Sequence, residues 1–168
     1  TATGRKAATM LPELGHFALI VALTIALVLG TLPLVGAQRG RVAWMALARP
    51  AALAQFTFVA LAFASLMASF ANNDFSVVNV ASNSNSELPL AYRLAATWGS
   101  HEGSMLLWVL MLTGWTAAVA LRSAHLPLPM VARVLGVMGL VSIGFLLFIL
   151  FTSNPFERLS PPALDGRD

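Results

Sequence analysis

One short stretch of the chain concentrates the side chains that can do chemistry. Residues 98–108 read WGSHEGSMLLW, which sets a histidine and a glutamate between glycines and tryptophans. On one continuous helix, six side chains follow steps of three and four residues and are expected to share a face: Trp98, His101, Met105, Trp108, Leu112 and Trp115. Imidazole and thioether groups both serve as axial ligands of haem iron, and an aromatic face suits a flat cofactor.

A purely structural role explains the same residues. His101 and Glu102 can bond neighbouring backbone or water at the mouth of a helix, where Glu102 also complements the positive end of the helix dipole. Tyr92, Trp98 and Trp108 fit the belt of aromatic residues found at membrane–water interfaces. The residues alone leave both interpretations open.

The other candidate ligands are few. His16 stands at the entrance of an apolar block and His125 lies in a loop, so no pair of histidines has ligand spacing. The sequence contains no zinc-binding spacing, catalytic triad, phosphate-binding loop or carboxylate pair. We therefore predict no catalytic residue and no metal site. With no cysteine in the chain, disulfides and thiolate ligands are excluded.

The composition assigns the chain to the membrane proteins. It is 58% hydrophobic and 10% charged, whereas a soluble domain carries about 25% charged residues. Four blocks lack any charged residue and are each near the ~20 residues that a helix needs to cross a bilayer: 17–35, 51–71, 104–121 and 134–152. The expected fold is all-α, a polytopic membrane helix bundle with about four transmembrane helices. The net charge of +3 is spread over scattered basic residues, so no nucleic-acid partner is expected.

The charges of the loops predict the orientation. The loops after the first and third blocks contain arginines and no acid, which is typical of the cytoplasmic side. The long loop between the second and third blocks carries more acidic than basic residues. We therefore expect this loop and both termini to face outward. Within it, residues 82–86 have turn chemistry, and 88–95 can form a short helix at the membrane surface.

Small residues at intervals of four predict where helices approach each other closely. Ala60, Ala64 and Ala68 form one such stripe in the second block. Ala132 and Gly136 form another at the start of the fourth.

Several ordered motifs resemble the amino-terminal part of the CcmF family, the haem lyase component of cytochrome c maturation. They are MLPELGH at 10–16, VASNSN at 80–85, WGSHEGS at 98–104, and GFLLF at 144–148 leading to FTSNPF at 151–156. An NrfE-type lyase subunit shares this pattern. The resemblance divides the chain into an upstream extension or cloning remnant at 1–9, a four-helix membrane portion at 10–156, and an outward-facing tail at 157–168 where the family sequence is truncated.

The resemblance implies a multi-pass protein of the bacterial inner membrane that works on the periplasmic side. Its partners would be the remaining carboxy-terminal part of the lyase, a CcmE-type haem chaperone, a CcmH-type subunit, apocytochrome c and membrane lipid. Haem would be bound mainly by family segments absent from this chain, so no axial ligand is carried over to His16, His101 or His125. The fragment alone is expected to be inactive.

Our hypothesis for the motif makes it part of the outer wall along the path of haem or apocytochrome. Trp98 and Trp108 would supply apolar surface, while His101 and Glu102 would form a polar anchor. Two alternatives without haem chemistry stay open. A transporter subunit would need an ionisable residue inside a span, and the four blocks have none. A scaffold that docks partners is not distinguished from the lyase portion by the residues.

Overall fold

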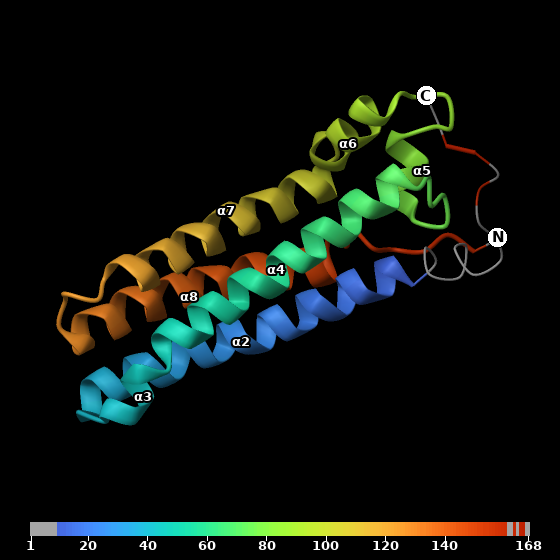
Figure 1. The fold of residues 1–168 in the computed structure, drawn as a ribbon. Coiled ribbons are helices and arrows are strands. Elements are labelled where there is room, and N and C mark those ends of the chain that lie inside the picture. Colours follow the sequence, from blue (N-terminus) through green and yellow to red (C-terminus); the bar gives the residue numbers. More distant parts are fainter. Residues whose placement is uncertain (1–9, 161–162, 164, 167–168) are drawn as a thin grey trace.

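The computed structural model describes residues 10–160, 163, 165 and 166. Four long helices lie side by side: α2 (Leu11–Arg39), α4 (Ala48–Ala71), α7 (His101–Arg122) and α8 (Leu128–Phe151) (Figure 1). Three short helices join them: α3 (Val42–Ala46), α5 (Val78–Asn83) and α6 (Leu90–Gly99). The predicted bundle is confirmed, because the structure contains 4 helices long and apolar enough to cross a membrane.

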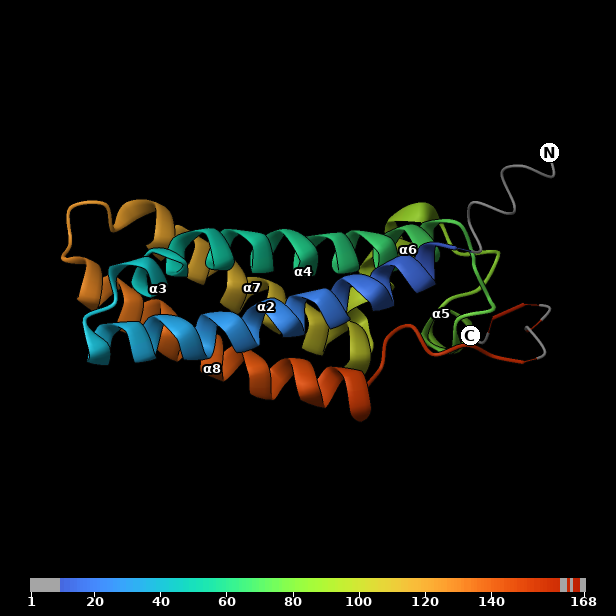
Figure 2. The same ribbon diagram turned by 90° about the horizontal axis from the view of Figure 1, so that it is seen from below.

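The two ends of the bundle differ in character. Helices α5 and α6 and the described part of the tail lie at one end, and α3 and the α7–α8 connection lie at the other (Figures 1 and 2). At the α3 end, the guanidinium of Arg49 donates a 2.8 Å hydrogen bond to the carbonyl of Ser123, which ties the two acid-free loops together. The two acid-free loops therefore lie at the same end of the bundle. Which side of the membrane they occupy stays a prediction.

The apolar blocks mark the interiors of the helices and underestimate their length. α2 begins six residues before Phe17, with Pro12 in its first turn, where a missing N–H costs nothing. It ends at Arg39 and is capped by Gly40, whose φ of 67° is the left-handed conformation that glycine favours. Charged and polar residues at helix ends lie at the membrane surface, where they are solvated, so a charge-free block stops short of the true end.

The bundle is built around α2, which packs against α4 on one side and α8 on the other, while α4 also packs against α7. The main cluster of fully buried side chains comes from all four long helices: Leu19, Leu66, Phe70, Leu106, Leu146 and Ile149. Buried hydroxyls within the spans, such as those of Thr116 and Ser142, donate to the carbonyl four residues earlier. These bonds satisfy polar groups that would otherwise be costly in an apolar interior.

Small residues allow α2 and α8 to approach closely. Gly136 is buried, and a Cβ added there would lie 2.6 Å from the side chain of Leu34, so the predicted stripe on this helix is confirmed. The predicted stripe on α4 is wrong, because Ala64 is exposed and α4 buries a different face. Alanine is so frequent in this helix that its spacing does not mark a contact face.

Gly139 provides the sharpest test of this packing. A Cβ at this position would lie 2.9 Å from the backbone nitrogen of Gly30 on α2. A change of side-chain rotamer cannot relieve a contact with the backbone, so the two helices would have to move apart. We expect Gly139→Ala to lower the free energy of unfolding by about 1–3 kcal/mol, measured by denaturant titration of the purified protein in detergent. Gly144→Ala on the same helix is the matched control, because a Cβ there meets nothing within 4 Å. Equal stability of the two variants would contradict the close approach.

Candidate functional site

The motif at 98–104 forms a sharp junction between two helices. Ser100 ends α6 and caps α7: its backbone is extended, with φ −80° and ψ 158°, and its hydroxyl accepts a 3.0 Å hydrogen bond from the N–H of Gly103. Trp98 therefore lies on α6, and the prediction of one continuous helical face from Trp98 onward is wrong. Serine is a strong helix N-cap, so it interrupts the helix where the apolar spacing alone predicted continuity. From His101 to Trp115 the expected face holds, since α7 covers all of it.

The two glycines of the motif have different roles. A Cβ at Gly103 would lie 1.6 Å from the carbonyl oxygen of Thr97, because the last turn of α6 rests directly on the first turn of α7. A Cβ at Gly99 would meet nothing within 4 Å. Only the second glycine is required by the geometry of the junction.

His101 faces α8 and the residues that follow it. Its Nδ1 lies 3.0 Å from the hydroxyl of Ser153, and its ring meets that of Phe148 edge-on, with ring centroids 6.5 Å apart. The hydroxyl fixes the orientation of the imidazole while the residue as a whole stays exposed. A ring held through one nitrogen presents the other nitrogen in a defined direction, as ligating and proton-transferring histidines do.

An open apolar groove of about 330 Å³ lies beside His101, between α7 and α8. It is lined by Met105, Gly144, Phe145 and Phe148. Two tryptophans further along α7 stay exposed, Trp108 at 62% and Trp115 at 70%. The aromatic surface predicted from the spacing is thus present on the outside of the bundle.

Glu102 belongs to a different site. It lines a small pocket of about 60 Å³ together with residues of α5 and of the segment after α8: Val78, Asn79, Ser82, Asn83, Asn154 and Glu157. Neighbouring residues on a helix point about 100° apart, so His101 and Glu102 face separate surroundings. The two residues that we expected to form one polar anchor, His101 and Glu102, therefore lie in separate places. The pocket brings together three motifs that the sequence kept far apart, and no local spacing could have predicted this.

The interior of this pocket is polar. Asn79 is 4% exposed, and its Oδ1 accepts a 3.0 Å hydrogen bond from the side-chain amide of Asn83. Its Nδ2 has no hydrogen-bond partner among the described residues. The carboxylate of Glu102 has no ion-pair partner in the same part of the chain.

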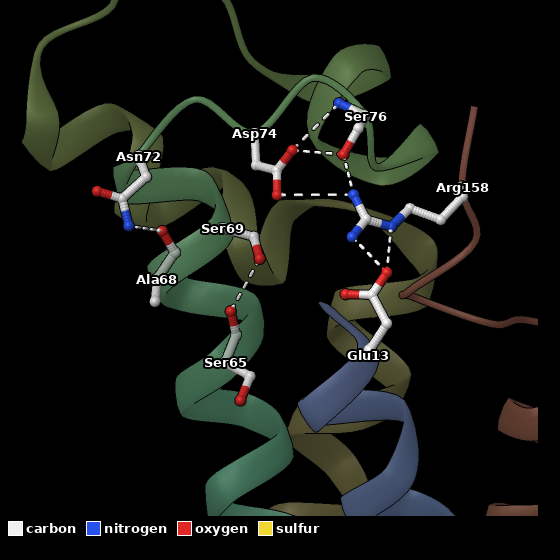
Figure 3. A network of polar contacts seen from close by, with 8 residues as sticks. All are labelled: Glu13, Ser65, Ala68, Ser69, Asn72, Asp74, Ser76 and Arg158. Atoms are coloured by element: carbon white, nitrogen blue, oxygen red, sulfur yellow. Dashed lines mark hydrogen bonds and ion pairs between the residues drawn. The ribbon is translucent and has the colours of Figure 1, made fainter. Parts of the chain in front are cut away.

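A network centred on Arg158 holds this end of the bundle together (Figure 3). The guanidinium pairs with Glu13 at the start of α2, lies 3.8 Å from a carboxylate oxygen of Asp74, and donates to the hydroxyl of Ser76. Backbone pairing adds to it, since the N–H of Leu159 donates a 2.8 Å hydrogen bond to the carbonyl of Ser76. The segment after α8 is therefore fastened to both α2 and the outer loop. The sequence showed Arg158 only as one of two arginines in a tail that also carries acidic residues.

The end of the described tail also contacts the outer loop. Asp165 accepts hydrogen bonds from the hydroxyl and the backbone N–H of Ser86. The hydrogen bond from the Ser86 hydroxyl contributes most to lowering the pKa of Asp165 below its usual value. The backbone N–H groups of Gly166 and Ser86 lower it further. The tail predicted at 157–168 thus lies, where described, at the same end as the long loop. The extension predicted at 1–9 lies outside the described residues.

The three histidines do not assemble into one centre. His125 is exposed in the α7–α8 connection, a helix length away from His101, or about 33 Å. His16 is half-buried near the start of α2, and its Nδ1 has no partner within the described ranges. The part of the chain that the structure describes holds no group of three or more His, Cys, Asp or Glu side chains placed to bind a metal ion. For haem, the α7–α8 groove offers an apolar wall, with the imidazole of His101 in contact with its lining residue Phe148. This arrangement fits contact at one side of haem only.

The fold and its motifs define a polytopic membrane helix bundle with a structured polar end, and similarity to known proteins identifies the class more closely. No family model matches the chain. The chain is 60% identical over 160 residues to the cytochrome c-type biogenesis protein CcmF of Pseudomonas aeruginosa. The aligned region covers 95% of this chain and 24% of that protein. The chain is 41% identical over 159 residues to the cytochrome c-type biogenesis protein NrfE of Haemophilus influenzae, covering 95% of this chain and 25% of that protein.

A solved structure agrees with these relatives. A cytochrome c haem lyase CcmF superimposes with a TM-score of 0.82 at 28% identity, over 88% of this chain and 25% of that one. The chain belongs to the CcmF family of cytochrome c-type biogenesis proteins and corresponds to its amino-terminal part. It spans about a quarter of the length of the curated relatives it matches.

Proposed function

We propose that this chain is the amino-terminal portion of a cytochrome c haem lyase and takes part in the transfer and attachment of haem to apocytochrome c. The observation that carries the proposal is the 60% identity to a CcmF protein over nearly the whole chain. The higher identity to CcmF than to NrfE favours a CcmF-type lyase over the NrfE-type alternative.

In this proposal haem is the substrate, and the groove between α7 and α8 forms part of the wall along its path. The groove is lined by thioether, phenyl and backbone surface and has His101 at its outer end. Trp108 is exposed on α7, one turn past Met105, and Trp98 is exposed on α6, so both offer apolar surface to haem or apocytochrome. His101 is the polar anchor of this wall. Glu102 instead lines the polar pocket at α5, next to residues of the outer loop.

The rest of the activity is assigned to partners. One imidazole with no second histidine opposite it does not complete a haem site, so haem is expected to be held mainly by the remaining carboxy-terminal part of the lyase. A CcmE-type chaperone, a CcmH-type subunit and apocytochrome c would approach the end that carries α5, α6 and the tail. We place that end on the periplasmic side, because the opposite loops hold the acid-free arginines.

The test is cytochrome c formation in bacteria whose only lyase carries the substitution. We expect Ser153→Ala to lower the yield of haem-staining cytochrome c roughly tenfold, the low end of the cost of removing the partner that orients a ligating histidine. His101→Ala should lower the yield further, because the imidazole itself is lost. His125→Ala at the opposite end is the control and should leave the yield unchanged. If His101→Ala matched the control at equal protein level, the chain would be a scaffold without haem chemistry of its own.

A further inference from the structure

A second and larger groove has no role in the function proposed above. It has a volume of about 530 Å³ and runs along the first turns of α2 beside the segment after α8. The residues that line it include Glu13, Phe17 and Ile20 of α2 and Phe156, Glu157 and Arg158 of the segment after α8. Its floor is preformed, because the ring of Phe156 is buried against Gly15, where a Cβ would lie 2.3 Å from the ring.

The groove changes from polar to apolar along the helix axis. Glu13 lies in the first turn of α2, and Phe17 and Ile20 follow about one and two turns further along the helix. The side chains of Phe17 and Ile20 are 59% and 45% exposed. At 1.5 Å per residue, the distance from Glu13 to Ile20 is about 10 Å, which matches the step from the headgroup layer to the acyl chains of a bilayer. This gradient is the polarity profile of a phospholipid.

Among the described residues that line the polar end of the groove, there are two carboxylates, Glu13 and Glu157, and one guanidinium, Arg158. Arg158 is shared between Glu13 and Asp74, so one guanidinium serves two carboxylates. Glu157 is exposed at the rim and forms no ion pair with any described residue. Glu157 also borders the adjoining pocket, where Glu102 adds a further carboxylate. This charge attracts a cationic headgroup and repels an acidic one.

We propose that this groove is a binding site for a phospholipid with a primary amine, of the phosphatidylethanolamine class. The ammonium group lies at the carboxylate of Glu157, and the first part of an acyl chain lies along Phe17 and Ile20. A transmembrane helix is the competing occupant. It would have to bring its own cation to the same rim, whereas the lipid headgroup supplies one.

The test is binding of three lipids with identical acyl chains to the purified chain in detergent, followed by native mass spectrometry. The lipids are phosphatidylethanolamine, phosphatidylcholine and phosphatidylglycerol. We expect phosphatidylethanolamine to bind roughly tenfold more tightly than phosphatidylglycerol, a difference typical of one well-placed charge contact. Equal affinities for the three lipids would overturn the proposal.

Two substitutions separate the headgroup contact from the chain contact. Glu157→Gln should abolish the preference for phosphatidylethanolamine, and Phe17→Ala should weaken all three lipids alike. Glu87→Gln is the matched control, because Glu87 is an exposed acidic residue of the outer loop that does not line the groove. Equal effects of Glu157→Gln and Glu87→Gln would contradict the site. So would lipid binding by this chain that disappears in a longer lyase containing it, because another segment would then fill the groove.

Discussion

Replacing Gly103 with alanine is expected to lower the free energy of unfolding by about 3 kcal/mol or more, the upper end of the effects of overpacking. The added methyl group would lie 1.6 Å from the carbonyl oxygen of Thr97 and 2.8 Å from the hydroxyl of Ser100. Both neighbours are held in place, the first as backbone and the second as the cap of α7. The junction must therefore open, which displaces α6 and breaks the cap.

Gly99→Ala in the same motif provides the control. A Cβ there meets no atom within 4 Å, and the position closes α6. Alanine is favoured over glycine in helices by up to about 1 kcal/mol, so the variant should be as stable as the parent or slightly more so. Denaturant titration followed by circular dichroism measures both. If both variants lost a similar amount of stability, the close contact between Gly103 and Thr97 would not be the cause of the loss.

If the proposed function holds, Gly103→Ala also lowers activity. Opening the junction moves His101 away from Ser153, which would lower cytochrome c formation in cells along with stability. Ser153→Ala removes the hydrogen bond and leaves the junction closed. A large loss for Gly103→Ala and a small one for Ser153→Ala would show that the position of α7 matters more than the orientation of the imidazole.

Local properties explain why the fold class could be predicted from the sequence. A helix in a membrane satisfies its own backbone bonds, so length and the absence of charge identify each span without reference to the others. The turn at Asn85 is equally local, since its side-chain oxygen accepts hydrogen bonds from the N–H groups of Glu87 and Leu88. Helix α5 was not predicted, because its six residues are too short for a periodic pattern.

The site depends on contacts between segments distant in sequence, and these were only partly predictable. The spacing from His101 to Trp115 correctly predicted an aromatic face on α7. It could not show that His101 meets Ser153, 52 residues away. Nor could it show that Glu102 faces α5, because that contact depends on how the outer loop folds over the bundle. The helix break at Ser100 has a local signal, because serine is a preferred N-cap residue, but the apolar spacing continues across it and hides the break.

Arg158→Gln is expected to lower the free energy of unfolding by about 2–3 kcal/mol. Removing one partner of a buried ion pair costs about 3–5 kcal/mol, and the side chain of Arg158 is 30% exposed, which reduces the effect. The carboxylate most affected is that of Asp74, whose side chain is only 9% exposed and would lose its ion-pair partner. The contact between residues 145 apart in sequence, Arg158 and Glu13, would be lost as well.

Substitutions of the two carboxylates of the network, Glu13 and Asp74, separate these contributions. Glu13→Gln removes a carboxylate that is 59% exposed, so it should cost no more than about 1 kcal/mol, as is usual for surface pairs. Asp74→Asn combined with Arg158→Gln should recover part of the loss, because a neutral amide needs no counter-charge and can still accept the hydrogen bonds from Ser76. Denaturant titration of the single and double variants completes the cycle. If the double variant were less stable than Arg158→Gln alone, the network would act through packing of the segment after α8 rather than through charge, since only the electrostatic account makes the second substitution favourable.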